Sequence, residues 1–244
     1  MIKKFYFQKL LSTDFSQIRK FFKVDFLNSS FGNFPLLKFS QIISKNYPLL
    51  VIMAGCHGEE IASTLSIFEN YRLISAEARR HKVNLIIYPL VNPWGFFKNQ
   101  RYNQEGLNCN RGWIHQKIKK AKEVKIILKD LKKIKPLIFA SLHEDSEVEK
   151  EFFLYSFGER KYEKFLIEVG KKYFPILKDG FQEGVRVKDG VVFNDHDGLA
   201  EDFMHHRGCK FACCTETPLK QSLIKRKKCN RDLILKLIEL TSEG

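Results

Sequence analysis

Hydrophobic and polar positions alternate in blocks along most of the chain. Short apolar runs with the length of buried strands occupy residues 49–55, 83–90, 136–142, 151–157 and 209–216. Around them, apolar residues recur at helical spacing, which predicts helices over residues 59–81, 160–174 and 198–208, after His115 and at the C-terminal end. The sequence therefore predicts an α/β domain with a mixed, largely parallel central sheet flanked by helices.

The start of the chain has a less regular pattern. Residues 1–48 are rich in Phe and Lys, and residues 15–27 resemble a short amphipathic helix. No repeat or low-complexity linker follows. We therefore expect an N-terminal segment, residues 1–48, that packs on the domain without an assigned role, and a main domain of residues 49–244.

The composition adds a charge imbalance. The 244 residues are 44% hydrophobic, which is enough for one substantial core, and 42 Lys and Arg against 28 Asp and Glu give a net charge of +14. This charge favours anionic partners or substrates. The basic residues of 115–136 and 223–240 lie at helical spacing without a base-reading motif, so we interpret them as solvated helix faces and not as a nucleic-acid surface.

Several features bear on the compartment. No apolar run approaches the roughly 20 residues that span a bilayer, and the first residues lack the apolar core and cleavage site of a secretory signal. Six cysteines form no CxxC pair and are expected to be reduced thiols, with Cys213 and Cys214 as buried small residues. We expect a cytoplasmic protein with no membrane partner. The oligomeric state is left open.

Polar clusters fall where the predicted strands end. His57 and Glu60 follow the first strand, His143 follows the third, and Glu216 ends the last. In an α/β sheet the carboxyl ends of parallel strands form the usual ligand site. A His-x-x-Glu pair at a strand-to-helix turn has metal-ligand spacing, and a hydrolytic zinc needs one further protein ligand, for which His143 is suitable.

The order of these motifs resembles the zinc metallocarboxypeptidase superfamily, which also contains aspartoacylase-like and succinylglutamate desuccinylase-like deacylases and murein tripeptide amidases. The resemblance covers roughly residues 49–218. It rests on "HGEE", "NPWGF", "RYNQEGLNCNR", "SLHED" and "TETP", which occur in the family's order and at strand ends or in the loops after them.

The resemblance implies a role for each motif residue. His57, Glu60 and His143 are the implied ligands of one zinc ion per chain, and Glu216 is the implied general base for a metal-activated water. Arg101 resembles the arginine that polarises the scissile carbonyl. Asn110 and Arg111 resemble the pair that binds the substrate's free carboxylate, for which the planar guanidinium is suited.

Some residues keep alternative interpretations. Glu59 fits an acid at the positive end of a helix. Glu144 and Asp145 are either solvated loop acids or residues that orient a ligand or contact a cationic substrate. Asn108 stands where relatives commonly carry aspartate, a difference that we expect to affect loop geometry more than chemistry. Three further histidines are expected to have structural roles or to contact a metal ligand without binding the metal themselves: His196, His205 and His206. Three tyrosines lie in the interval where relatives carry a substrate-capping tyrosine: Tyr155, Tyr162 and Tyr173.

The implied function is a zinc-dependent hydrolase that cleaves an amide beside a free carboxylate, in a small peptide or murein fragment. An alternative within the same class is an N-acyl amino acid deacylase, because both use the same zinc, base and arginines. An alternative from another class is a catalytically silent basic module. A cysteine hydrolase built on Cys213 or Cys214 lacks a nucleophile-turn signature. Peptide or acyl substrate and side-chain specificity are left open.

Overall fold

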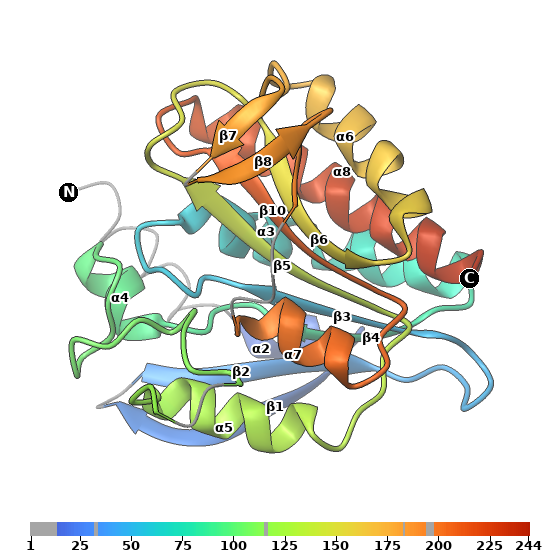
Figure 1. The fold of residues 1–244 in the computed structure, drawn as a ribbon. Coiled ribbons are helices and arrows are strands. Elements are labelled where there is room, and N and C mark those ends of the chain that lie inside the picture. The colour runs from blue at the N-terminus through green and yellow to red at the C-terminus, as the bar shows by residue number, and fades with distance from the viewer. Residues whose placement is uncertain (1–13, 32–33, 115–116, 183, 194–197) are drawn as a thin grey trace.

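A ten-stranded sheet runs through the middle of the molecule (Figure 1). The computed structural model describes residues 14–31, 34–114, 117–182, 184–193 and 198–244. The sheet has the order β1-β2-β4-β3-β5-β10-β6-β9-β8-β7. Its strands are β1 (Lys23–Phe31), β2 (Phe34–Gln41), β3 (Leu49–Ala54), β4 (Asn84–Tyr88), β5 (Ile138–Asp145), β6 (Phe153–Gly158), β7 (Gly180–Gln182), β8 (Val185–Lys188), β9 (Val191–Val192) and β10 (Phe211–Pro218).

The middle of the sheet is parallel. β4, β3, β5 and β10 pair side by side in the same direction, and β10 then pairs antiparallel with β6. A strand buried on both faces reads as a continuous apolar run, which explains why "LLVIMA" and "NLIIY" contain almost no polar residue. The mixed sheet predicted from the sequence is confirmed. Parallel pairing is confined to β4, β3, β5 and β10 and to β6 with β9, whereas the other pairings are antiparallel.

Helices cover both faces of this sheet. The described helices are α2 (Phe15–Arg19), α3 (Ile61–Arg80), α4 (Pro93–Lys98), α5 (Lys122–Leu131), η1 (Arg160–Tyr162), α6 (Glu163–Lys171), α7 (Ala200–His206) and α8 (Leu223–Ser242). Alternate residues of β3 enter different cores. Leu50 and Ile52 pack with α3, α6 and α8, whereas Val51 and Met53 pack with α5 and α7 on the opposite face (Figure 1).

The N-terminal prediction is partly wrong. The helix α2 ends at Arg19, and the expected helical residues from Lys23 onward belong to β1. Apolar residues at 24, 26 and 27 fit a strand as well as a helix, and antiparallel pairing with β2 decides in favour of the strand. β2 in turn pairs with β4, so β1 and β2 extend the main sheet at one edge. The division of the chain at residue 48 stays a prediction.

Among the described residues, no helix combines the length and the apolar character that crossing a membrane requires.

The turn that follows β3 packs directly on the backbone of α4. The Gly58 N–H donates to the Gln100 carbonyl oxygen at 3.1 Å. A Cβ built on Gly58 would lie 1.8 Å from the carbonyl carbon of Gly95. No L side chain fits between these two segments, so the glycine inside "HGEE" is required by backbone contact.

We therefore expect Gly58→Ala to destabilise the protein by about 3 kcal/mol, because two backbone segments must move apart. Urea unfolding measures the change. Gly106→Ala is the control, since Gly106 has a φ of +70° but open space around it, and only about 1 kcal/mol of conformational cost is expected. Equal losses in the two variants would contradict the close contact.

Candidate metal centre and active site

Three neighbouring strands deliver polar side chains to one edge of the sheet. His57 and Glu60 lie in the turn between β3 and α3, with Glu60 directly before the first residue of the helix. His143 lies near the end of β5. The parallel register of β5 and β10 pairs His143 with Glu216, so the two residues are adjacent in the sheet.

His57, Glu60 and His143 form a buried cluster. Their exposed fractions are 2%, 2% and 1%. Nδ1 of His57 lies 2.5 Å from one carboxylate oxygen of Glu60, and Nδ1 of His143 lies 2.8 Å from the other. Potential ligand atoms of all three residues lie within 4.8 Å of one another, so the set can hold a metal ion. Two imidazoles and one carboxylate, buried together, form a donor set suited to zinc.

Asn108 fixes the orientation of one imidazole. Its Oδ1 lies 3.0 Å from Nε2 of His57 and also accepts the backbone N–H of Asn110 at 2.7 Å. When Nε2 carries the proton and donates it to this oxygen, Nδ1 presents its lone pair to the cluster. Asn108 therefore contacts a candidate metal ligand as well as the loop backbone, and the expectation that it affects loop geometry more than chemistry stays a prediction.

The charges of this buried cluster are stabilised by one another and not by water. Burial opposes ionisation of Glu60, but the two facing imidazoles outweigh it and hold the pKa of the Glu60 carboxyl below its ordinary value. Burial likewise opposes protonation of His143, and the Glu60 carboxylate outweighs it and raises the pKa of that imidazole. The two imidazoles and the carboxylate therefore stabilise one another.

Glu216 lies beside this cluster on β10. Burial raises the pKa of its carboxyl, and the negative charges of Glu60 and Asp145 raise it further against the opposing effect of His143. The Cys214 thiol donates to Glu216 Oε1 at 3.4 Å. Ligand atoms of His143, Cys214 and Glu216 also lie within 4.8 Å of one another. Burial raises the pKa of the Cys214 thiol well above its ordinary value, which disfavours the thiolate that ligates metals.

The long segment after α4 supplies the basic side of the site. Nη1 of Arg101 lies 3.6 Å from Glu60 Oε1 and 3.7 Å from Glu59 Oε1. The segment is held by Asn103, whose Oδ1 accepts two backbone N–H groups and whose amide donates to the buried Glu123 carboxylate at 2.8 Å. Sequence patterns show no signal for this anchoring, because Asn103 and Glu123 belong to different elements.

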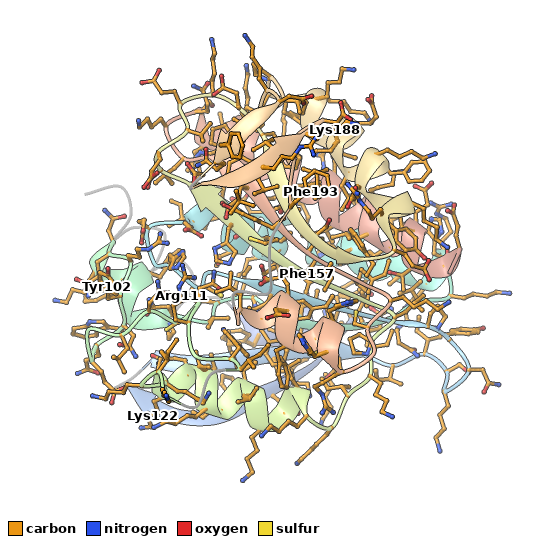
Figure 2. The ribbon with its side chains drawn as sticks, viewed as in Figure 1. Tyr102, Arg111, Lys122, Phe157, Lys188 and Phe193 are labelled. Atoms are coloured by element: carbon orange, nitrogen blue, oxygen red, sulfur yellow. The ribbon has the colours of Figure 1, made fainter. Side chains whose placement is uncertain are left out.

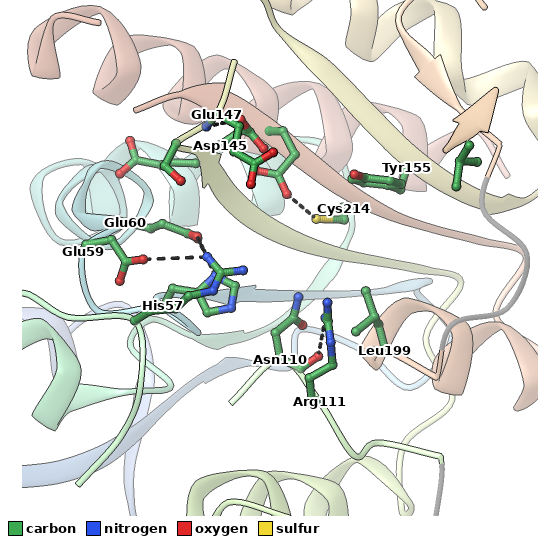
Figure 3. Close-up of a pocket in the computed structure, with 15 residues that line it drawn as sticks. His57, Glu59, Glu60, Asn110, Arg111, Asp145, Glu147, Tyr155, Leu199 and Cys214 are labelled. Carbon is green, nitrogen blue, oxygen red and sulfur yellow. Dashed lines mark hydrogen bonds and ion pairs between the residues drawn. The ribbon is translucent and has the colours of Figure 1, made fainter. Parts of the chain in front are cut away.

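One pocket of about 500 Å³ brings the predicted residues together (Figure 3). Six of the seven predicted site residues line it, and the seventh, His143, contacts Glu60. The lining members of the predicted set are His57, Glu60, Arg101, Asn110, Arg111 and Glu216. Their roles stay predictions.

Other candidates separate by position. Of the three tyrosines, Tyr155 lines the pocket, whereas Tyr162 is buried against Phe211 and Tyr173 donates to Asp232. The remaining histidines belong to no metal-capable set among the described residues: His205 stacks on Phe157, and His206 contacts Asp202. His196 lies outside the described residues. Figure 2 shows Phe157 close to α7.

Glu144 connects the metal-capable cluster to the surrounding helices. It is buried, follows His143, accepts the N–H of Ala62 at the start of α3 at 3.1 Å, and forms an ion pair with Arg226 of α8. Burial raises the pKa of the Glu144 carboxyl, and Arg226 opposes that rise. This ion pair therefore ties the end of β5 to both helices.

Solved structures with the same fold come from several bacteria. A candidate metallopeptidase of Shewanella amazonensis is 28% identical and has a TM-score of 0.85, with 96% of this chain and 91% of that chain covered. A metallo-carboxypeptidase of Burkholderia cenocepacia is 18% identical (TM-score 0.72, 94% and 67% covered). The murein-tripeptide amidase of Escherichia coli O157 is 16% identical (TM-score 0.61, 88% and 91% covered).

The fold and the site match the zinc carboxypeptidase-like superfamily. Within it, residues 46–149 match the family model of the succinylglutamate desuccinylase/aspartoacylase catalytic domain. No curated protein sequence matches the chain. The resemblance stated from the motifs is confirmed, and the similar proteins support a hydrolase in general terms.

Arg226→Met should destabilise the protein by about 3–5 kcal/mol, because it leaves the Glu144 charge buried without its partner. The double variant Arg226→Met/Glu144→Gln should recover most of this loss, since the amide keeps the hydrogen bond to Ala62 and carries no charge. Lys227→Met breaks a neighbouring ion pair nearer the surface, with Glu69, and is the control. It should lower the free energy of unfolding by less than about 1 kcal/mol. Chemical denaturation measures all three, and an unrescued double variant would argue against the ion pair.

Proposed function

We propose that this protein is a zinc-dependent hydrolase that cleaves an amide bond beside a free carboxylate, with residues 49–244 as its catalytic domain. The observation that supports this most is the convergence of a metal-capable His-Glu-His set, the Glu216 carboxylate and the Arg111 guanidinium on one pocket. The six cysteines are free and buried, which fits the proposed action in the reducing cytoplasm.

His57, Glu60 and His143 would hold the zinc, the two histidines through Nδ1. The distances support this choice, because Nδ1 of each ring already points at the Glu60 carboxylate. When bound, zinc acts as a Lewis acid that lowers the pKa of water toward neutrality and polarises a carbonyl. Asn108 keeps the His57 ring in the orientation that this binding requires.

Glu216 is the proposed general base. Its carboxylate borders the metal-capable cluster and accepts a hydrogen bond from Cys214, so it is held in place. A raised pKa suits a group that must first take a proton from attacking water and then deliver it to the leaving amine. The carboxylate oxygens are the atoms that carry this proton.

The two arginines are assigned to different parts of the substrate. Arg101, close to Glu60, is suited to the scissile carbonyl, where negative charge develops during the reaction. Arg111 and Asn110 lie together on the other side of the cluster, and the guanidinium fork matches a free carboxylate. Arg111 Nη1 donates to the Asn110 backbone carbonyl at 3.3 Å, which restrains the pair.

A deacylase is the second candidate, and the match of residues 46–149 to the desuccinylase/aspartoacylase family model favours it. The same metal, base and arginines would then remove an acyl group from an N-acyl amino acid. An assay of the purified, zinc-loaded protein against C-terminal peptides, murein tripeptide, and N-acyl aspartate or glutamate separates the two. Turnover confined to the N-acyl amino acids would replace the peptidase proposal by the deacylase.

The purified protein should hold about one zinc per chain, as expected for a site with three protein ligands. His57→Ala and His143→Ala should each lose the metal, because each removes one of three donors. His206→Ala should retain it, since that side chain is 57% exposed and contacts Asp202. Elemental analysis of the folded variants measures this, and zinc retained in both ligand variants would refute the assignment.

Glu216→Gln should keep zinc and fold but lose about 10²–10⁴-fold in kcat, because an amide cannot accept a proton at neutral pH. Steady-state kinetics and metal content are measured on the same preparation. Near wild-type turnover would remove Glu216 as the base. Loss of zinc would instead make it a ligand, with the set of His143, Cys214 and Glu216 as the alternative site.

A further inference from the structure

The surface around α5 carries charge of one sign. Apart from Ile118, every exposed side chain that the structure describes between residues 117 and 135 belongs to a lysine. Neither acid of this segment balances them at the surface, since Glu123 is buried and Asp130 forms an ion pair with Lys38 of β2 at 2.6 Å. We call the lysines on and directly after the last turns of α5 the lysine face: Lys125, Lys129, Lys132 and Lys133.

The lysine face differs from the other basic helix of the molecule. On α8, most basic side chains contact an acid, as in a solvated helix face of mixed charge: Arg226, Lys227, Arg231 and Lys236. Within the described part of the chain, the lysine face forms no ion pair. The positive charge at α5 is therefore left for a partner outside the chain.

This arrangement does not stabilise the helix. Lys129 lies four positions after Lys125 and four before Lys133, so their ammonium groups are neighbours on one helix face and repel one another. Burial lowers the pKa of the nearby Lys120 ammonium, and the charge of Lys132 lowers it further. The lysine face therefore lowers folding stability, and an anionic partner would offset this by supplying the opposite charge.

A hollow of about 310 Å³ adjoins the lysine face where α5 lies beside β1 (Figure 1). Leu27 of β1 and Ile126 of α5 give it an apolar lining, and Lys129 and Lys133 border it. The paired Asp130 lines it as well. The hollow is large enough for an aliphatic side chain, and a ligand that fills it would bring its flanking groups close to the lysines.

We propose that the lysine face is a docking surface for an acidic protein segment that places an apolar side chain in this hollow. Charge complementarity selects an anionic partner. A nucleic acid fits less well, because residues 117–135 contain neither an arginine fork nor an aromatic ring on which a base stacks. A bilayer also fits less well, because the apolar side of α5 packs against the sheet and is not available for insertion. The inference is independent of the proposed reaction, since the lysine face does not line the active-site pocket.

Probes of matched charge test the kind of partner. One is a capped peptide of eight glutamates with a leucine at its centre, the second has serine in place of leucine, and the third is an oligothymidylate with eight phosphodiesters. With the full-length protein, fluorescence anisotropy should show the leucine peptide binding about 10-fold more tightly than the other two, because only leucine buries apolar surface in the hollow. Added salt should weaken this binding.

Several outcomes would overturn the inference. They are an absence of binding by every probe, equal binding of the leucine and serine peptides, and binding of the oligothymidylate as tight as that of the leucine peptide. Displacement of the leucine peptide by phosphatidylglycerol vesicles at equal charge concentration would do the same, because it would indicate a membrane surface.

Variants tie the binding to the lysine face. Replacing all four of its lysines by glutamine should weaken binding of the leucine peptide by about 10-fold or more. The melting temperature should not fall, because glutamine is a good helix former and the repulsion between the lysines is removed. The control changes the net charge equally by replacing four exposed lysines around α6 with glutamine: Lys161, Lys164, Lys171 and Lys172.

The control should bind the leucine peptide within about 2-fold of the wild type, since its lysines lie on another helix. The single variant Lys129→Gln removes the ammonium group nearest the middle of the face and should weaken binding by about 3-fold, which tests the face with the smallest change to the helix. Wild-type affinity in both lysine-face variants, or an equal loss in the α6 control, would contradict the assignment.

Discussion

A carboxylate buried between two imidazoles is the feature on which the rest of the structure depends. Burying the Glu60 charge is costly unless it is paired, and it is paired only when β3 and β5 lie side by side with their ends aligned. The parallel register of β5 with β10 then sets Glu216 beside the same point. The tight turn at Gly58 and the ion pair between Glu144 and Arg226 hold the elements that meet there.

Much of this arrangement was predictable, for identifiable reasons. β3, β4, β5 and β10 are buried on both faces, so each appears in the sequence as an apolar run with polar residues at its end. The shorter helices α5 and α6 have a clear apolar period. Because ligands collect at the carboxyl ends of parallel strands, a site at the ends of β3, β5 and β10 could be expected from the sequence. The selection of the seven candidate residues, and of Arg101, Asn110 and Arg111 in particular, came from the family resemblance.

Other features were beyond prediction because they depend on long-range contacts. Pairing with β2, and not local propensity, makes residues 23–31 a strand. The strands β7, β8 and β9 contain two to four residues and give almost no periodic signal. The contact of Asn108 with His57 joins positions 51 residues apart, and Tyr155 could be distinguished from Tyr162 and Tyr173 only by its place beside the pocket.

The oxygen of Asn108 has a consequence for how the two halves of the site communicate. This single atom contacts the His57 ring and also accepts the N–H of Asn110, so the proposed metal side and the proposed carboxylate side share one hydrogen-bond acceptor. A displacement of either neighbour changes the geometry available to the other. Coupling between binding events is reciprocal. If metal binding at His57 raises the affinity for a substrate at Asn110, substrate binding must raise the metal affinity by the same factor.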